Sequence, residues 1–150
     1  MQLFHASPFK FEHFTLDHIG KGEGGIALGY GLYLSEDLKV ARRFEDYFLS
    51  RYGQAHLYTV TLQAKRHEIL DLDSDCKEPP PSETIDYQSL RDKKGDIEAF
   101  KKLLGMGIKG VRDYIQDDRG YVFLCVQPKF LRIDHCETRT LQPKQMGETQ

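Results

Sequence analysis

The chain has 150 residues, of which 39% are hydrophobic and 29% charged, and its formal net charge is −2 at pH 7. This length suits one domain with a real core, and the near-neutral charge gives no global argument for binding nucleic acid through phosphate contacts. No apolar run approaches the length of a membrane span, and the first residues lack the pattern of a signal peptide. Three cysteines without a CxxC pair, and histidines without metal-ligand spacing, argue against a disulfide scaffold and a metal site. We therefore expect no membrane partner and no metal, in a protein that is cytoplasmic or delivered into a host cell without a signal peptide.

The first third of the chain predicts two short strands on either side of a glycine-rich loop. Residues 3–7 are typical of a strand that the following proline ends. Residues 29–34 alternate small or apolar with aromatic residues, as a short strand does. Residues 37–49 place apolar side chains at helical spacing behind an N-cap at Ser35 or Asp37. The loop between the strands is crowded with glycines, which cost backbone entropy unless a ligand or another backbone approaches closely: Gly20, Gly22, Gly24 and Gly25.

The rest of the chain predicts further strands with helices inserted among them. One or two amphipathic helices are expected within residues 85–104. The run at residues 121–126 is continuously apolar, which is typical of a strand buried on both faces. From about residue 135 the composition is polar without periodicity, so we expect a domain over residues 1–134 and a loosely ordered tail over residues 135–150. Together with the apolar run, the expected strands give an α+β fold class: residues 56–62, 68–73, 108–112 and 130–133.

An acidic alternation follows the strand expected near residue 70. Asp71, Asp73 and Asp75 faintly resemble a calcium loop, but its glycine and terminal glutamate are missing at the required offsets. We therefore expect a solvated acidic turn.

Several short motifs follow one another in an order that is more specific than any of them alone. They are FHAS at residues 4–7, IGKGEG at 19–24, GYGLY at 29–33, LYTVTL at 57–62, LDLD at 70–73 and GIKGVR at 107–112. In this order they resemble the ADP-ribosyltransferase fold of the diphtheria-toxin and poly(ADP-ribose) polymerase type. They are most similar to the small transferase domains of phage polyvalent proteins, over about residues 3–133. The resemblance implies a split, strongly twisted β-structure with inserted helices and NAD held in a cleft between two small sheets.

The resemblance also implies roles for individual residues. His5, together with Ser7, would hold the adenosine ribose of NAD, and the backbone of Ala6 would grip the nicotinamide carboxamide. Tyr33 would stack on the nicotinamide ring, whose other face Phe44 would cover. Three glycines would let the backbone approach the cofactor, two of them in a flexible flap: Gly22, Gly24 and Gly31.

The implied activity is mono-ADP-ribosylation, in which ADP-ribose passes from NAD to a macromolecular acceptor and nicotinamide leaves. We expect a protein acceptor in preference to a nucleic acid, in a phage, toxin or effector setting that could include an inhibitory or antitoxin partner. The chain departs from the family at the glutamate that usually precedes the last apolar strand, because residues 117–121 contain none. With His5 and Tyr33 as the other catalytic residues, the carboxylate itself is left unassigned: Asp118 is the candidate named for the role, and Asp117 or Gln127 are alternatives.

Two other functions stay open at this point. Without the glutamate the fold could be catalytically degenerate and bind NAD, ADP-ribose or a protein partner. An NAD glycohydrolase, with water as the acceptor, is the second alternative. His5, Tyr33 and Phe44 could also be ordinary core residues, since most strand and helix aromatics are.

Overall fold

The structure is a computed structural model, and it describes residues 1–16, 28–73 and 86–141. Within these residues seven β-strands, three α-helices and two short 3-10 turns form an α+β fold, as the sequence predicted. None of the helices in the described part of the chain is long and apolar enough to cross a membrane. In chain order the strands and α-helices are β1 (Gln2–Ser7), β2 (Leu32–Ser35), α1 (Leu38–Tyr52), β3 (Gln54–Leu62), β4 (Ile69–Asp71), α2 (Tyr87–Lys94), α3 (Asp96–Gly105), β5 (Gly110–Ile115), β6 (Gly120–Cys125) and β7 (Leu131–Thr140).

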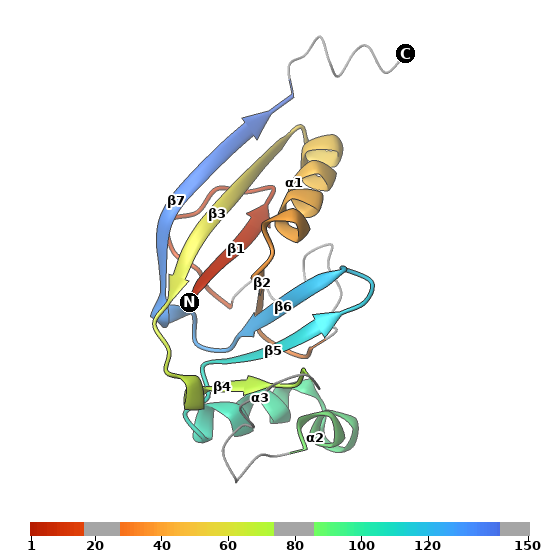
Figure 1. Ribbon diagram of the computed structural model, residues 1–150, viewed down its shortest axis with the longest axis vertical. Helices are drawn as coiled ribbons and strands as arrows, with labels where there is room; N and C mark the ends of the chain where they lie inside the picture. Colours follow the sequence, from red (N-terminus) through yellow and green to blue (C-terminus); the bar gives the residue numbers. More distant parts are fainter. Residues whose placement is uncertain (17–27, 74–85, 142–150) are drawn as a thin grey trace.

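The strands form one mixed sheet in the order β4-β5-β6-β2-β1-β3-β7. Only the β4–β5 pair is parallel among these described neighbours. β1 pairs with β3 along its whole length, whereas β1 and β2, both described in full, share a single register pair, Phe4 with Ser35. The pairing between neighbouring strands is therefore shortest in the middle of the sheet, between β1 and β2. Figure 1 shows α1 beside β1 and β3, with β7 on the far side of β3, while β4 and β5 lie in the part of the sheet nearer to α2 and α3.

The apolar run at residues 121–126 separates two core clusters. Val122 and Leu124 pack into a cluster with residues of α2 and α3, which we call the helix-side cluster. Phe123 and Cys125 point the other way and pack with residues of β1 and β3, in what we call the strand-side cluster. Side chains alternate between the faces of a strand, so the predicted burial on both faces is confirmed.

The helix α1 begins one residue later than predicted and ends three residues later. Gly53 ends it in the left-handed conformation, with φ of 79° and an N–H that donates to the carbonyl of Leu49, as is common at a helix C-terminus. Asp37 stands at the N-cap position but its side chain makes no capping hydrogen bond. β2 begins at Leu32, later than the predicted residue 29.

The prediction of a loose tail from residue 135 is wrong for its first part, because β7 continues to Thr140. β7 pairs with β3 from Leu62–Leu131 to Gln54–Thr140. Arg139, on this strand, donates to the carboxylates of Glu45 and Asp46 on α1, at 3.1 Å in each case. In the sequence, the polar residues of an edge strand resemble a loosely ordered tail, because their hydrogen-bond partners are distant in the chain. Residues 142–150 lie outside the described part of the chain.

Candidate functional site

His5 lies where β1 and β2 diverge. Its Nδ1 is 2.7 Å from the carbonyl oxygen of Tyr33. A carbonyl oxygen can only accept a hydrogen bond, so Nδ1 carries the proton and Nε2 is the acceptor nitrogen of the neutral ring. Burial lowers the pKa of His5 below its usual value of 6.5, which favours this neutral form at pH 7.

Aromatic rings surround the imidazole of His5. The ring centroids of Phe11, Phe14 and Tyr58 lie 6.0, 5.4 and 6.4 Å from it. Phe11 stacks on Tyr58 at 4.4 Å, and the Tyr58 hydroxyl both accepts from the Phe11 N–H at 2.8 Å and donates to its carbonyl at 3.2 Å. The segment after β1 is thus tied down beside His5, which restricts the orientation of the ring.

Tyr33 is held through its hydroxyl by the backbone that leads into β2. The hydroxyl donates to the carbonyl of Gly29 at 2.6 Å and accepts from the N–H of Leu28 at 3.1 Å. The Tyr33 ring packs against the helix-side cluster, whereas the neighbours of His5 belong to or pack against the strand-side cluster. The structure therefore connects His5 and Tyr33 through a backbone oxygen and does not bring the two rings face to face.

The other residues predicted to bind the cofactor have varied surroundings. Ser7 is buried, and its hydroxyl accepts from the N–H of Phe9 at 3.0 Å. Ala6 packs against the cluster formed by α1 and β3, and Phe44 on α1 is 38% exposed. A Cβ on Gly31 would lie 2.6 Å from Cδ1 of Leu124, so this glycine allows close packing against β6. The predicted contacts of the glycine loop, by Gly22 and Gly24, lie outside the described residues.

Asp118 lies in the tight turn between β5 and β6, two residues before β6 begins. The guanidinium of Arg43, on α1, donates to its backbone carbonyl oxygen. Burial raises the pKa of the Asp118 carboxyl, and the Arg43 charge partly offsets that effect. The backbone of Asp118 is therefore tied to α1 through Arg43.

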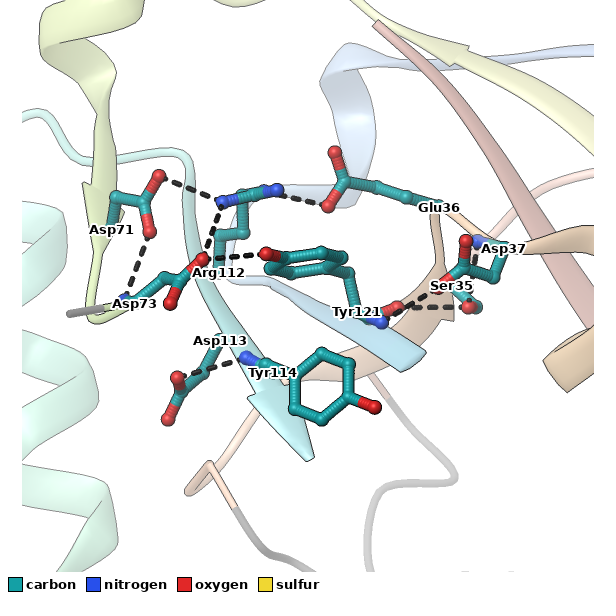
Figure 2. A network of polar contacts seen from close by, with 9 residues as sticks. All are labelled: Ser35, Glu36, Asp37, Asp71, Asp73, Arg112, Asp113, Tyr114 and Tyr121. Atoms are coloured by element: carbon teal, nitrogen blue, oxygen red, sulfur yellow. Dashed lines mark hydrogen bonds and ion pairs between the residues drawn. The ribbon is translucent and has the colours of Figure 1, made fainter. Parts of the chain in front are cut away.

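A polar network that the sequence did not predict is centred on Arg112 of β5 (Figure 2). Its Nε donates to Glu36 at 2.6 Å, and its Nη1 lies 3.0 Å from Oδ2 of Asp71 and 3.8 Å from Oδ2 of Asp73. The guanidinium carbon lies 3.9 Å from the centroid of the Tyr121 ring, in cation–π contact. The Tyr121 hydroxyl donates to Asp73 at 2.7 Å. One arginine thus joins β4, β5, β6 and the residue that follows β2.

The prediction of a solvated acidic turn is wrong for the two described aspartates. Only 9% of the Asp71 side chain and 11% of the Asp73 side chain are exposed, and both face Arg112. The signal was present in the LDLD and GIKGVR motifs, because acids after one strand and a cation in a later one can meet when the strands are neighbours. Asp75 lies outside the described residues.

The backbone of Tyr121 is also held by the residues between β2 and α1. The Ser35 hydroxyl donates to the Tyr121 carbonyl at 2.8 Å and accepts from the N–H of Asp37 at 3.0 Å. The Tyr121 N–H donates to Oδ2 of Asp37 at 2.8 Å. The start of β6 and the start of α1 therefore form one rigid corner, which Figure 2 shows beside the Arg112 network.

Comparison with known proteins identified no relative: no family model matches the chain, and no curated protein or solved structure matches it significantly. Among the described residues, no group of three or more His, Cys, Asp or Glu side chains is arranged to hold a metal ion. The arrangement offers an imidazole held by the carbonyl of Tyr33, the acidic side chain of Asp37 held at the start of β6 and an exposed Phe44 ring on α1.

Proposed function

We propose that this chain is an NAD-dependent mono-ADP-ribosyltransferase that modifies a macromolecular acceptor and releases nicotinamide. The observation that carries the proposal is the short pairing between β1 and β2, which share one register pair, with His5 beside that pair and bound to the carbonyl of Tyr33. The resemblance in the sequence implies a cleft between two small sheets with a histidine of the first strand beside it. The described strands form one seven-stranded sheet and not two small ones, and what supports a site at this junction is the single register pair, Phe4–Ser35, that joins β1 to β2.

The proposed reaction makes modest chemical demands on the protein. The bond between nicotinamide and ribose breaks, and its electron pair goes to the ring nitrogen of nicotinamide, which thereby loses its positive charge. A lone pair on the acceptor forms the new bond to the same ribose carbon, and the acceptor proton passes to solvent. The transition state resembles the oxocarbenium ion of glycoside hydrolysis, so orientation and electrostatics are the main tasks of the protein.

Three groups suit these tasks. The neutral Nε2 of His5 can accept a hydrogen bond from a ribose hydroxyl. Ala6 presents its backbone without a bulky side chain, and the Phe44 ring, which is 38% exposed, can lie against a flat cationic ring. Tyr33 takes a narrower role than the sequence implied, because its hydroxyl is bound to the backbone of residues 28 and 29. In this proposal Tyr33 positions His5 through its carbonyl oxygen.

Nicotinamide release from NAD by the purified chain tests the proposal, with a host-cell lysate as the source of acceptor and adenine-labelled NAD to follow transfer. His5→Asn keeps a donor for the Tyr33 carbonyl but removes Nε2, and His135→Asn alters an exposed histidine of β7 as the matched control. We expect release and labelling by the wild type and the control, and a loss of both in His5→Asn.

The other outcomes of this assay distinguish a glycohydrolase, an inactive protein and a protein that only binds NAD. Release without any labelled macromolecule would identify a glycohydrolase that uses water as the acceptor. The absence of release from the folded wild type, with the lysate present, would contradict the proposed activity. NAD binding without release would then identify the degenerate form of the fold.

A further inference from the structure

The first residue of β6 has no room for a side chain. A Cβ built on Gly120 would lie 2.6 Å from Cγ2 of Val40 and closer still to Oδ2 of Asp37. Real Cβ atoms essentially never approach other heavy atoms within 3.0 Å. An acidic side chain therefore cannot start from Gly120 while α1 keeps its place.

The carboxylate of Asp37 lies against Gly120 instead. The Tyr121 N–H donates to its Oδ2 at 2.8 Å, and the Ser35 hydroxyl holds the Asp37 N–H at 3.0 Å. An aspartate at an N-cap position ordinarily accepts a hydrogen bond from the second or third amide of its helix. The side chain of Asp37 makes no such bond, because it is turned toward β6.

The two neighbouring acids are less suited to act at a reacting ribose. The Glu36 carboxylate is 2.6 Å from Nε of Arg112, so its charge is already paired. Asp118 lies in the turn before β6, where burial raises the pKa of its carboxyl. The described partner of the Asp37 carboxylate is a backbone N–H, which orients the group without neutralising its charge.

We infer that Asp37 is the catalytic carboxylate of the proposed transferase, an assignment that rests on the proposed function and replaces Asp118. Breaking the nicotinamide–ribose bond builds positive charge at the ribose carbon, and a nearby carboxylate stabilises it. The Asp37 carboxylate reaches the start of β6 from the N-cap position of α1, because Gly120 has no side chain to fill that space. Its backbone hydrogen bonds fix it before substrate arrives, and such preorganisation is what makes electrostatic stabilisation effective.

The test compares Asp37→Asn with Asp118→Asn in the nicotinamide-release assay, with NAD binding measured by calorimetry for both variants. Asparagine keeps the shape of Asp37 and an oxygen for the Tyr121 N–H but removes the charge. We expect kcat of Asp37→Asn to fall by about 100-fold or more, the size of effect seen when one preorganised electrostatic group is removed. NAD affinity should stay close to that of the wild type, and Asp118→Asn should retain most of its kcat. If Asp37→Asn proves unstable, Asp37→Ser, which keeps an N-cap residue, should show the same loss.

The outcomes separate the two levels of the proposal. A wild type that releases nicotinamide, with an Asp37→Asn variant of nearly unchanged kcat, would overturn the assignment of Asp37 and leave the proposed function standing. A loss confined to Asp118→Asn would return the role to Asp118. A folded wild type that releases no nicotinamide would overturn the function and the assignment together.

Discussion

Nδ1 of His5 lies 2.7 Å from the carbonyl oxygen of Tyr33, across the point where β1 and β2 diverge. Because this bond fixes which ring nitrogen carries the proton, it joins the architecture of the sheet to the chemistry of the proposed site. The same bond holds an imidazole beside three aromatic rings. A histidine held in this way has consequences that can be measured without any substrate.

The stability of the fold should depend on pH through two of its histidines, of which His56 is buried and His5 is partly buried. Burial lowers the pKa of both His5 and His56 below the usual 6.5. The unfolded chain therefore takes up protons, as the pH falls below about 6.5, that the folded chain does not. We expect the free energy of unfolding to be fully retained above this pH and to decrease below it. Urea denaturation of the wild type and of His5→Asn from about pH 7.5 to about pH 5, a range around the unperturbed histidine pKa, measures the effect. The variant should lose part of the pH dependence, and an unchanged slope would contradict the neutral state of His5.

Removal of the Arg112 side chain should destabilise the fold. Arg112→Met keeps the stem of the side chain but removes the guanidinium that lies beside the mostly buried carboxylates of Asp71 and Asp73. Breaking a fully buried ion pair costs about 3–5 kcal/mol, and with 21% of the Arg112 side chain exposed we expect about 1–3 kcal/mol. Arg112→Lys keeps the charge but not the planar fork of the guanidinium. Its free energy of unfolding should therefore lie between those of the wild type and Arg112→Met. Denaturant titration of the three proteins checks this order, and Arg112→Met as stable as the wild type would contradict it.

Tyr87 should stabilise the backbone that leads into β2. This ring is 1% exposed, and its hydroxyl donates to the carbonyl of Leu28 at 2.6 Å. Tyr87→Phe leaves that carbonyl without this donor, which we expect to cost about 1–2 kcal/mol. Tyr114→Phe, at a residue 40% exposed, is the matched control and should change the free energy of unfolding by less than about 0.5 kcal/mol. Equal effects of the two substitutions would argue against a stabilising role of the hydrogen bond from Tyr87 to Leu28.

Two glycines should respond oppositely to alanine. Gly120→Ala forces a Cβ toward Val40 and Asp37, so we expect a loss of about 1–3 kcal/mol from overpacking. A Cβ on Gly105, at the end of α3, meets no described atom within 4 Å. Gly105→Ala should therefore stabilise the helix by up to about 1 kcal/mol. Thermal unfolding of both variants measures these effects. An unchanged stability of Gly120→Ala would mean that α1 does not pack closely against the start of β6.

Most strands and helices of the fold could be predicted from local patterns in the sequence. The apolar run at residues 121–126 and the alternation at residues 56–62 correctly predict β6 and β3, because periodicity depends on neighbours in the chain. The end of β7 was not predicted, because its polar residues bind partners on β3 and α1 that are distant in the sequence. His56 and Thr138 are 82 residues apart, and Arg42 and Glu137 are 95 residues apart. The sheet order likewise depends on pairings that periodicity does not encode.

The candidate site was less predictable than the fold. The motifs pointed to His5, but the anchoring of the Tyr33 hydroxyl by residues 28 and 29 depends on how the chain turns before β2. The sequence predicts Asp37 only as a possible helix N-cap. That its carboxylate points toward β6 is known only from the structure, where α1 packs close to Gly120. Such a relationship requires two elements more than 80 residues apart to meet, as the Asp37–Tyr121 hydrogen bond shows.

NAD binding by the wild type, His5→Asn and His135→Asn, measured by isothermal titration calorimetry, tests the central claim most directly. If His5 contacts the nucleotide, the wild type and His135→Asn should bind NAD with the same affinity. His5→Asn, which stays folded but lacks Nε2, should then bind about tenfold more weakly, as the loss of one hydrogen bond of roughly 1.4 kcal/mol implies. Equal affinity of all three proteins, or no binding by the folded wild type, would contradict a nucleotide site at the junction of β1 and β2.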